Sequence, residues 1–153
     1  MAASLSVAFN RKFSSLDVQD IFGFDYVDGP VFTANTSETL LASITIPAGM
    51  LTERLSIIVH GVLKYTTWNS YACNCRGELK IYVNGTEVKS RIIGMSQYTC
   101  GNALTGYVGR TIFYSTTDLD FTSDITVEVK GLILNGVNQG YGIGFDSIII
   151  GGK

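Results

Sequence analysis

The sequence predicts an all-β domain built as a two-sheet β-sandwich. Apolar and polar residues alternate with a period of two in several stretches, which is the pattern of strands that bury one face. Asparagine–glycine pairs, which favour tight hairpin turns, follow two of these stretches. The chain contains 17 glycines, only 2 prolines and 16% charged residues, a composition that suits short strands joined by turns. Several strands separated by such turns are typical of sandwiches and barrels.

The first clear strands lie between residues 40 and 65. Residues 40–46 alternate and end at the turn sequence Pro-Ala-Gly of residues 47–49. Residues 55–65 form a longer run that is apolar on both faces near its middle. This second run is therefore expected to be a central strand.

A β-hairpin is the most distinct local element. Residues 79–83 and 86–89 both alternate, and Asn84 and Gly85 separate them. Both central positions of a type I′ turn need positive φ, which asparagine and glycine adopt most easily. The pattern predicts a tight two-residue turn here.

The second half of the chain adds three further strands. They are expected at residues 107–114, 125–133 and 143–150, where β-branched and apolar residues dominate one or both faces. Helical periodicity is weak and confined to residues 14–22, which could form one short turn.

The first 30 residues lack regular alternation and are rich in aromatic residues. We predict that residues 1–30 form a docking segment and that residues 31–153 form the β-sandwich domain. An aromatic segment without its own core is expected to dock on the domain or on a neighbouring subunit. The predicted docking residues are Phe9, Phe13, Phe22, Phe24 and Tyr26. The segment lacks the basic and apolar regions of a secretory signal.

Charge and hydropathy argue against nucleic-acid and membrane partners. The formal net charge is -2 and the basic residues are scattered, whereas nucleic-acid-binding proteins gather them into a stripe. No apolar run approaches the ~20 residues that span a bilayer. The low share of charged residues instead indicates a surface partly hidden in an assembly.

Three cysteines, at Cys73, Cys75 and Cys100, cannot all pair within one chain. A tetrahedral zinc site within the chain would need all three together with the only histidine. Two interpretations stay open: one disulfide from Cys100 to Cys73 or Cys75, or three free thiols. We predict no metal and no cofactor.

The only histidine, His60, lies in the middle of a predicted strand. Catalytic bases usually lie on loops or strand ends that substrate can reach. We therefore interpret His60 as a strand residue that bonds a neighbour or lies at a subunit interface.

Two groups of aspartates and one glycine run have structural interpretations. Aspartates at Asp118, Asp120 and Asp124, and again at Asp25 and Asp28, lie where this residue stabilises turns. Weak calcium binding stays open. The glycine run at residues 140–144 opens a strand, whereas a phosphate-binding loop opens a helix. We predict no catalytic residues and no enzymatic activity.

Two predicted loops, at residues 65–76 and 96–104, hold the aromatic residues that are candidates for ligand binding. Tryptophan and tyrosine bind by stacking or by filling interface pockets. The candidates are Tyr65, Trp68, Tyr71 and Tyr98. Alternatively, Trp68 covers one end of the sandwich core.

Residues 37–51, Ser-Glu-Thr-Leu-Leu-Ala-Ser-Ile-Thr-Ile-Pro-Ala-Gly-Met-Leu, resemble a segment of many tailed-phage virion proteins. In those proteins a long strand similar to residues 55–61 follows. A hairpin strand similar to residues 79–86 comes next, and a closing pair is similar to residues 125–131 and 145–150.

This resemblance covers roughly residues 31–150 and implies a jelly-roll domain of head fibres, capsid decoration proteins or tail appendages. It implies a non-enzymatic virion structural protein, made in the host cytoplasm, that self-associates as a homotrimer and docks on other proteins of the capsid or tail. The insertion at residues 68–75 departs from the pattern, so head and tail locations both stay open. The alternative is a carbohydrate-binding receptor-recognition module of a tail fibre that binds a host surface glycan.

Overall fold

The structure, a computed structural model, describes residues 3–4, 20–23, 31–67, 75–95, 104–135 and 141–153. These residues form ten strands: β1 (Ala3–Ser4), β2 (Asp20–Gly23), β3 (Val31–Thr33), β4 (Thr39–Ile46), β5 (Leu55–Thr67), β6 (Cys75–Val83), β7 (Thr86–Met95), β8 (Leu104–Thr116), β9 (Ile125–Asn135) and β10 (Gly142–Gly152). None of the described residues belongs to a helix long and apolar enough to cross a membrane.

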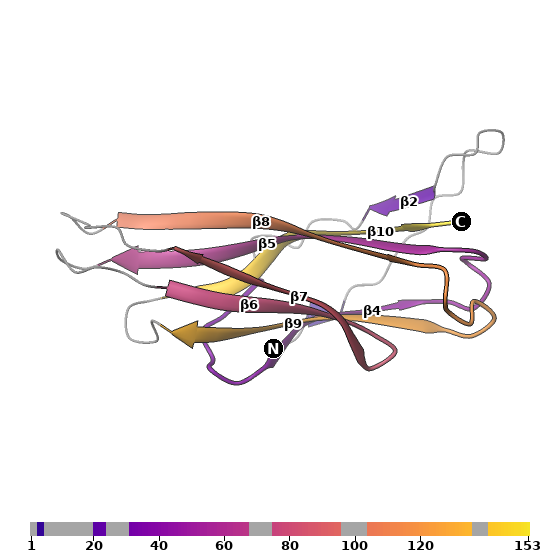
Figure 1. Ribbon diagram of the computed structural model, residues 1–153, viewed down its shortest axis with the longest axis horizontal. Coiled ribbons are helices and arrows are strands. Elements are labelled where there is room, and N and C mark those ends of the chain that lie inside the picture. Colours follow the sequence, from indigo (N-terminus) through magenta and orange to yellow (C-terminus); the bar gives the residue numbers. More distant parts are fainter. Residues whose placement is uncertain (1–2, 5–19, 24–30, 68–74, 96–103, 136–140) are drawn as a thin grey trace.

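The strands form two sheets that pack face to face (Figure 1). Sheet A has the order β1-β4-β9-β6-β7, and sheet B has the order β2-β10-β5-β8, with β3 also paired to β10. The eight strands from β3 to β10 pair as nested antiparallel partners: β3 with β10, β4 with β9, β5 with β8 and β6 with β7. A chain wound in this way is a jelly roll, so the predicted fold class is confirmed.

The core lies between the sheets because alternate residues of each strand point inward. In β9 buried and partly exposed residues alternate from Ile125 to Ile133. Leu55, Ile57 and Leu63 of β5 are fully buried against aliphatic residues of sheet A. Burial of each such side chain stabilises the fold by about 1.5–3 kcal/mol, so this core is the main source of stability.

The predicted hairpin turn between β6 and β7 is confirmed. Asn84 has φ 49° and Gly85 has φ 77°, as a type I′ turn requires. The side-chain oxygen of Asn84 also accepts a 2.8 Å hydrogen bond from the backbone N–H of Thr126, which attaches the turn to the start of β9.

Two short strands from the predicted docking segment add to the sheets. β1 pairs in parallel with β4, and β2 pairs antiparallel with the end of β10. The prediction of a helical turn at residues 14–22 is wrong for its last residues, because Asp20–Gly23 is a strand. β3 pairs with only the first part of β10, so the later backbone groups on that edge remain to bind β2.

Of the predicted docking residues, only Phe22 lies in a described strand, where its backbone is opposite Ile150. Phe9, Phe13, Phe24 and Tyr26 lie outside the described residues. Docking through this segment stays a prediction.

Gly144 allows β3 to lie beside β10. A Cβ at this position would overlap the carbonyl oxygen of Val31 and lie 2.7 Å from the ring of Phe32. A Cβ at Gly142 would lie 3.2 Å from the Cβ of Phe32, which is tight but tolerable. Glycine is therefore required at the first position and only favoured at the second.

We expect Gly144→Ala to lower the free energy of unfolding by about 3 kcal/mol, because the methyl group must push β3 away from β10. Gly142→Ala is the matched control, since it adds the same methyl group to the same strand below the same ring, and it should cost less than about 1 kcal/mol. Urea unfolding of both variants measures the difference. Equal losses would contradict the assigned role of Gly144.

Candidate functional site

The outer face of sheet B carries apolar side chains on both sides of a short polar row. Along β5, Leu55, Ile57 and Leu63 point into the core, so the residues between them point outward. The same alternation holds on the neighbouring strands. We define the apolar outer face by six outward residues: Phe32, Ile58, Val62, Tyr107, Phe113 and Ile149.

An aromatic pair covers one half of this face. Phe32 of β3 lies against Gly142 and Gly144 of β10, and its ring centroid is 6.5 Å from that of Tyr107 on β8. The two planes make an angle of 29°, so the rings stack. Val62, which points outward in the same row, is only 3% exposed. The aromatic residues on this face thus extend across the sheet from one edge to the other.

The other half of the face combines Phe113 with two aliphatic residues. Ile149, Ile58 and Phe113 lie opposite one another on β10, β5 and β8. Phe113 is 57% exposed and Tyr107 is 59% exposed. Large apolar side chains exposed together on one face are typical of an interaction surface.

A polar row separates the two apolar halves. His60 Nε2 lies 3.7 Å from Oδ2 of Asp146, and His60 Nδ1 lies 3.5 Å from Oγ1 of Thr111. Asp146 occupies a bulge in β10, between Phe145 and Ser147. Such bulges redirect a side chain, and here the bulge turns Asp146 towards His60.

The polar row does not have the spacing of a catalytic dyad. A nucleophile and its base need about 2.6–3.2 Å between heavy atoms, and both contacts of His60 are longer. The interpretation of His60 as a strand residue that bonds a neighbour is confirmed by the contact with Thr111.

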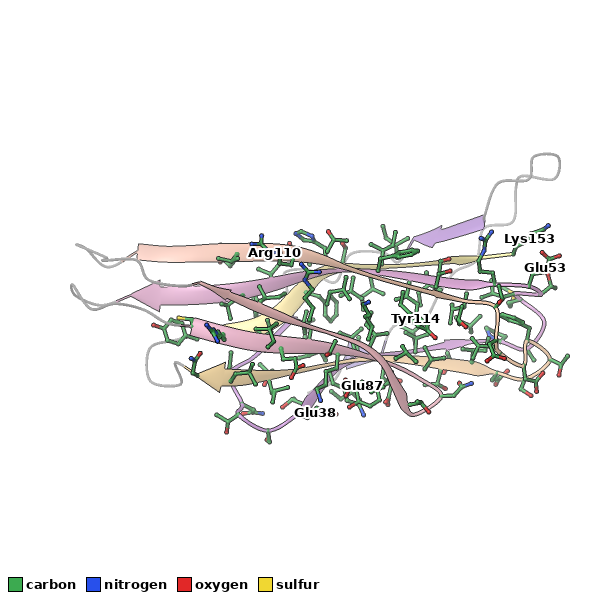
Figure 2. All side chains as sticks on the ribbon, in the orientation of Figure 1. Glu38, Glu53, Glu87, Arg110, Tyr114 and Lys153 are labelled. Carbon is green, nitrogen blue, oxygen red and sulfur yellow. The ribbon has the colours of Figure 1, made fainter. Side chains whose placement is uncertain are left out.

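The outer face of sheet A carries a network of paired charges beside the exposed side chains of Ile92 and Leu134. Lys80 lies 3.3 Å from Glu38 and 3.0 Å from Glu87, while Lys130 lies 3.1 Å from Glu128. The hydroxyl of Tyr82 donates to Glu38 at 2.9 Å, and the Lys130 ammonium lies 4.1 Å from the centre of the Tyr82 ring. Figure 2 shows Glu38 and Glu87 on this side of the sandwich.

This network shifts the pKa of its members. Partial burial raises the pKa of Glu38, but the hydrogen bonds from Tyr82 and Lys80 outweigh that effect and the net pKa is lowered. Burial and the bond to Glu38 raise the pKa of Tyr82 to about 12. The charged groups of this network therefore bind one another within the outer face of sheet A.

The apolar outer face is not among the sites that the sequence predicts. Residues 55–65 are apolar on both faces near their middle. That pattern predicts a central strand, and it is equally typical of a strand whose outer side chains form an apolar surface. Phe32, Tyr107 and Phe113 lie far apart in the sequence, so only the strand order brings them together.

The strand ends that flank the predicted ligand-binding loops lie at one end of the sandwich. Trp68, Tyr71 and Tyr98 lie outside the described residues, and Tyr65 lies in β5 with its backbone opposite Gly106. The strand ends that flank residues 68–74, 96–103 and 136–140 are paired with one another: Thr67 with Leu104, Cys75 with Met95 and Arg76 with Asn135. All three connections therefore start and end at one end of the molecule (Figure 1).

The structure also describes two of the aspartates that were predicted to stabilise turns. Asp120 accepts hydrogen bonds from the Thr122 hydroxyl at 2.5 Å, the Ser123 hydroxyl at 2.8 Å and the Thr122 N–H at 3.0 Å, and these bonds lower its pKa. Asp124 accepts one from the Ala48 N–H at 2.9 Å, so both act in turns as predicted. The described residues contain no group of three or more metal-binding side chains.

Gly142 is the first residue of β10, which confirms that the glycine run opens a strand. Cys75 is buried at the start of β6, whereas Cys73, Cys100, Asp25 and Asp28 lie outside the described residues.

No protein-family model and no curated protein matches the chain. Among solved structures, it is similar to VP2 in the subviral particle of infectious bursal disease virus, at 16% identity and a TM-score of 0.45, over 97% of this chain and 37% of that chain. It is similar to the structure of the Gx strain of that virus at 15% identity and a TM-score of 0.49, over 97% and 37%. It is also similar to the insecticidal δ-endotoxin Cry8Ea1 from Bacillus thuringiensis, at 12% identity and a TM-score of 0.44, over 79% and 19%.

The chain therefore spans well under two thirds of the length of each of these proteins. With identities this low, the assignment of the fold rests on the strand pairing of the chain itself.

Tyr82→Phe removes the hydroxyl that donates to Glu38 and keeps the ring. We expect the pKa of Glu38 to rise, because its carboxylate loses a bond that favours the charged form. In the wild type the folded pKa of Glu38 lies below its ordinary value of 4.5, so its stabilisation is present above that pH and is lost as pH falls through the folded pKa. The variant should lose less stability on acidification, as measured by thermal unfolding across this range and by NMR titration of Glu38.

Tyr107→Phe provides the control, because it removes an exposed tyrosine hydroxyl from the opposite face of the sandwich. It should leave the titration of Glu38 unchanged. If Tyr82→Phe also leaves that titration unchanged, the proposed network does not set the pKa of Glu38.

Proposed function

We propose that this chain is a non-enzymatic structural subunit of a virus particle, which acts by self-association through the apolar outer face and by docking on other virion proteins. The observation that carries this proposal is the contrast between two faces of one jelly roll. Sheet A carries a network of paired charges and also exposes Ile92 and Leu134, whereas sheet B exposes Tyr107 and Phe113 over aliphatic neighbours and carries one short polar row.

Physical chemistry favours burial of this face in an assembly. Covering a large apolar side chain contributes about 1.5–3 kcal/mol, and Tyr107 and Phe113 are both more than half exposed in the isolated chain. Tyrosine and phenylalanine are enriched at the centres of protein interfaces. His60 and Asp146 in the polar row supply directional contacts within the same surface, which would orient a partner.

In more specific terms, the protein is a tailed-phage capsid decoration protein, head fibre or tail appendage. The resemblance of residues 31–150 to virion proteins of tailed phages supports this assignment. The subunit forms a homotrimer that buries the apolar outer face, and residues 1–30 attach the trimer to the capsid or tail. It is made in the host cytoplasm and then incorporated into the virion.

We propose that the chain catalyses no reaction, and the contacts of three polar side chains support this. Asp120 and Asp124 are engaged in turns, and the contacts of His60 are too long for a nucleophile and base.

A second candidate function is recognition of a host surface glycan. It is supported by the common end of the sandwich from which the connections carrying Trp68, Tyr71 and Tyr98 depart. Tryptophan and tyrosine side chains suit stacking on sugar rings. Binding to a glycan array that is lost in Trp68→Ala would favour this candidate.

We expect Tyr107→Ser combined with Phe113→Ser to convert the trimer into monomers, because the substitutions remove the exposed apolar area of sheet B. The matched control combines Ile92→Ser and Leu134→Ser, which are exposed by 54% and 43% on the outer face of sheet A. The control should remain trimeric. Light scattering after size exclusion measures the mass of each protein at several concentrations.

A wild-type chain that is monomeric at all concentrations, or equal behaviour of the two double variants, would contradict the proposed use of this face. The virion role has its own test: antibodies against the purified chain should label particles released by a host that makes it. Particles without label would contradict that role even if trimers form.

A further inference from the structure

Among the described residues, the edge strand β8 has no partner along one of its two edges. Its 13 residues pair with β5 along their full length, and sheet B ends there. None of the described residues pairs with the other edge of β8, which lies on the same side of the sandwich as β7 (Figure 1). A long unpaired edge is a template for an added strand.

The inner side of this edge is basic. Arg110 is opposite Gly61, and a Cβ at Gly61 would point at Leu79 and Ile93 of sheet A, so Arg110 faces inward. Arg91 of β7 is opposite the buried Leu79 and therefore faces inward too. Lys89 is opposite the buried Ile81 in the same way. We call Lys89, Arg91 and Arg110 the basic edge.

The basic edge lacks acidic partners. All three residues are exposed, and within the described part of the chain none of them forms an ion pair with a carboxylate. Arg110 donates only to the neighbouring carbonyl of Gly109, at 3.1 Å. By contrast, Lys80 and Lys130 on the outer face of sheet A are both paired. Figure 2 labels Arg110 on β8, away from the acidic side chains of Glu38 and Glu87.

The charges decide which strand can bind here. If β8 paired with β8 of a second copy about a twofold axis at Arg110, two guanidinium groups would lie directly opposite each other. Like charges in that position are unfavourable, and inward-pointing charges on a border strand protect it from self-pairing. A strand with a carboxylate opposite Arg110 would instead form a charge-assisted hydrogen bond.

The outer side of the β8 edge determines which other residues an added strand needs. Tyr107 and Phe113 stand on either side of Gly109 and Thr111, where smaller side chains leave room. Residues of an added strand would alternate between this side and the basic side. The positions beside Tyr107 and Phe113 favour apolar residues, because cross-strand pairs of aromatic and β-branched side chains stabilise a sheet.

We propose that the free edge of β8 binds an extended segment of a partner protein in which carboxylate residues alternate with apolar residues. The carboxylates lie on the inner side against Arg110 and Arg91, and the apolar residues lie beside Tyr107 and Phe113. The segment adds to the edge of sheet B, not to its outer face. The inference thus goes beyond the virion role and does not depend on it.

The test uses the full-length chain and two labelled synthetic peptides, one of four Val-Glu repeats and one of four Val-Lys repeats. Fluorescence anisotropy should show saturable binding of the Val-Glu peptide and none of the Val-Lys peptide. Arg110→Glu should weaken binding of the Val-Glu peptide about tenfold or more, since a charged hydrogen bond is replaced by repulsion. Arg76→Glu, an exposed change of equal charge on the outer side of β6, should leave binding unchanged.

Amide hydrogen exchange locates the bound peptide. The amides of β8 should become protected when the Val-Glu peptide binds, and those of β1 and β4 should not. Equal binding of the two peptides, equal weakening by Arg110→Glu and Arg76→Glu, or unprotected β8 amides would overturn the proposal. A cross-linked dimer that joins β8 to β8 would also overturn it, because the edge would then belong to a second copy.

Discussion

The position of β10 between β3 and β5 is the constraint on which the rest of the structure depends. Nested strand pairing brings the last strand of the jelly roll to the first, so β10 must enter sheet B at this place. Gly144 permits the close approach of β3, and the bulge at Asp146 moves the alternation by one residue. As a result Ile148 and Ile150 enter the core while Ile149 faces outward.

The two outer faces follow from that arrangement and have different chemistry. On sheet A, oppositely charged residues of neighbouring strands lie within reach of each other and satisfy one another, together with the hydroxyl of Tyr82. On sheet B, the strand order places aromatic and aliphatic residues side by side and leaves Phe113 and Tyr107 in water. A subunit with one such face is suited to assembly, and the proposed virion role follows from this asymmetry together with the resemblance to phage proteins.

The local elements could be predicted from the sequence, and the surfaces could not. The alternation of residues 125–133 and the Asn84-Gly85 turn are local signals, and both appear in the structure as expected. Asp20–Gly23 is a strand only because β10 has a free edge beside it, which no local pattern records. The apolar outer face and the basic edge each combine residues from different strands, so they exist only once the strand order is known. The candidate aromatic residues at Trp68, Tyr71 and Tyr98 remain predictions from sequence.

The most direct test of the central claim is hydroxyl-radical footprinting of the chain, free and in the assembled particle. Aromatic side chains react readily when exposed, so the rate of oxidation reports which face is covered. The account predicts that Tyr107 and Phe113 become protected on assembly, while Tyr82 on the outer face of sheet A reacts at the same rate in both states. Unchanged oxidation of Tyr107 and Phe113, with protection of Tyr82, would show that the chain assembles through the opposite face.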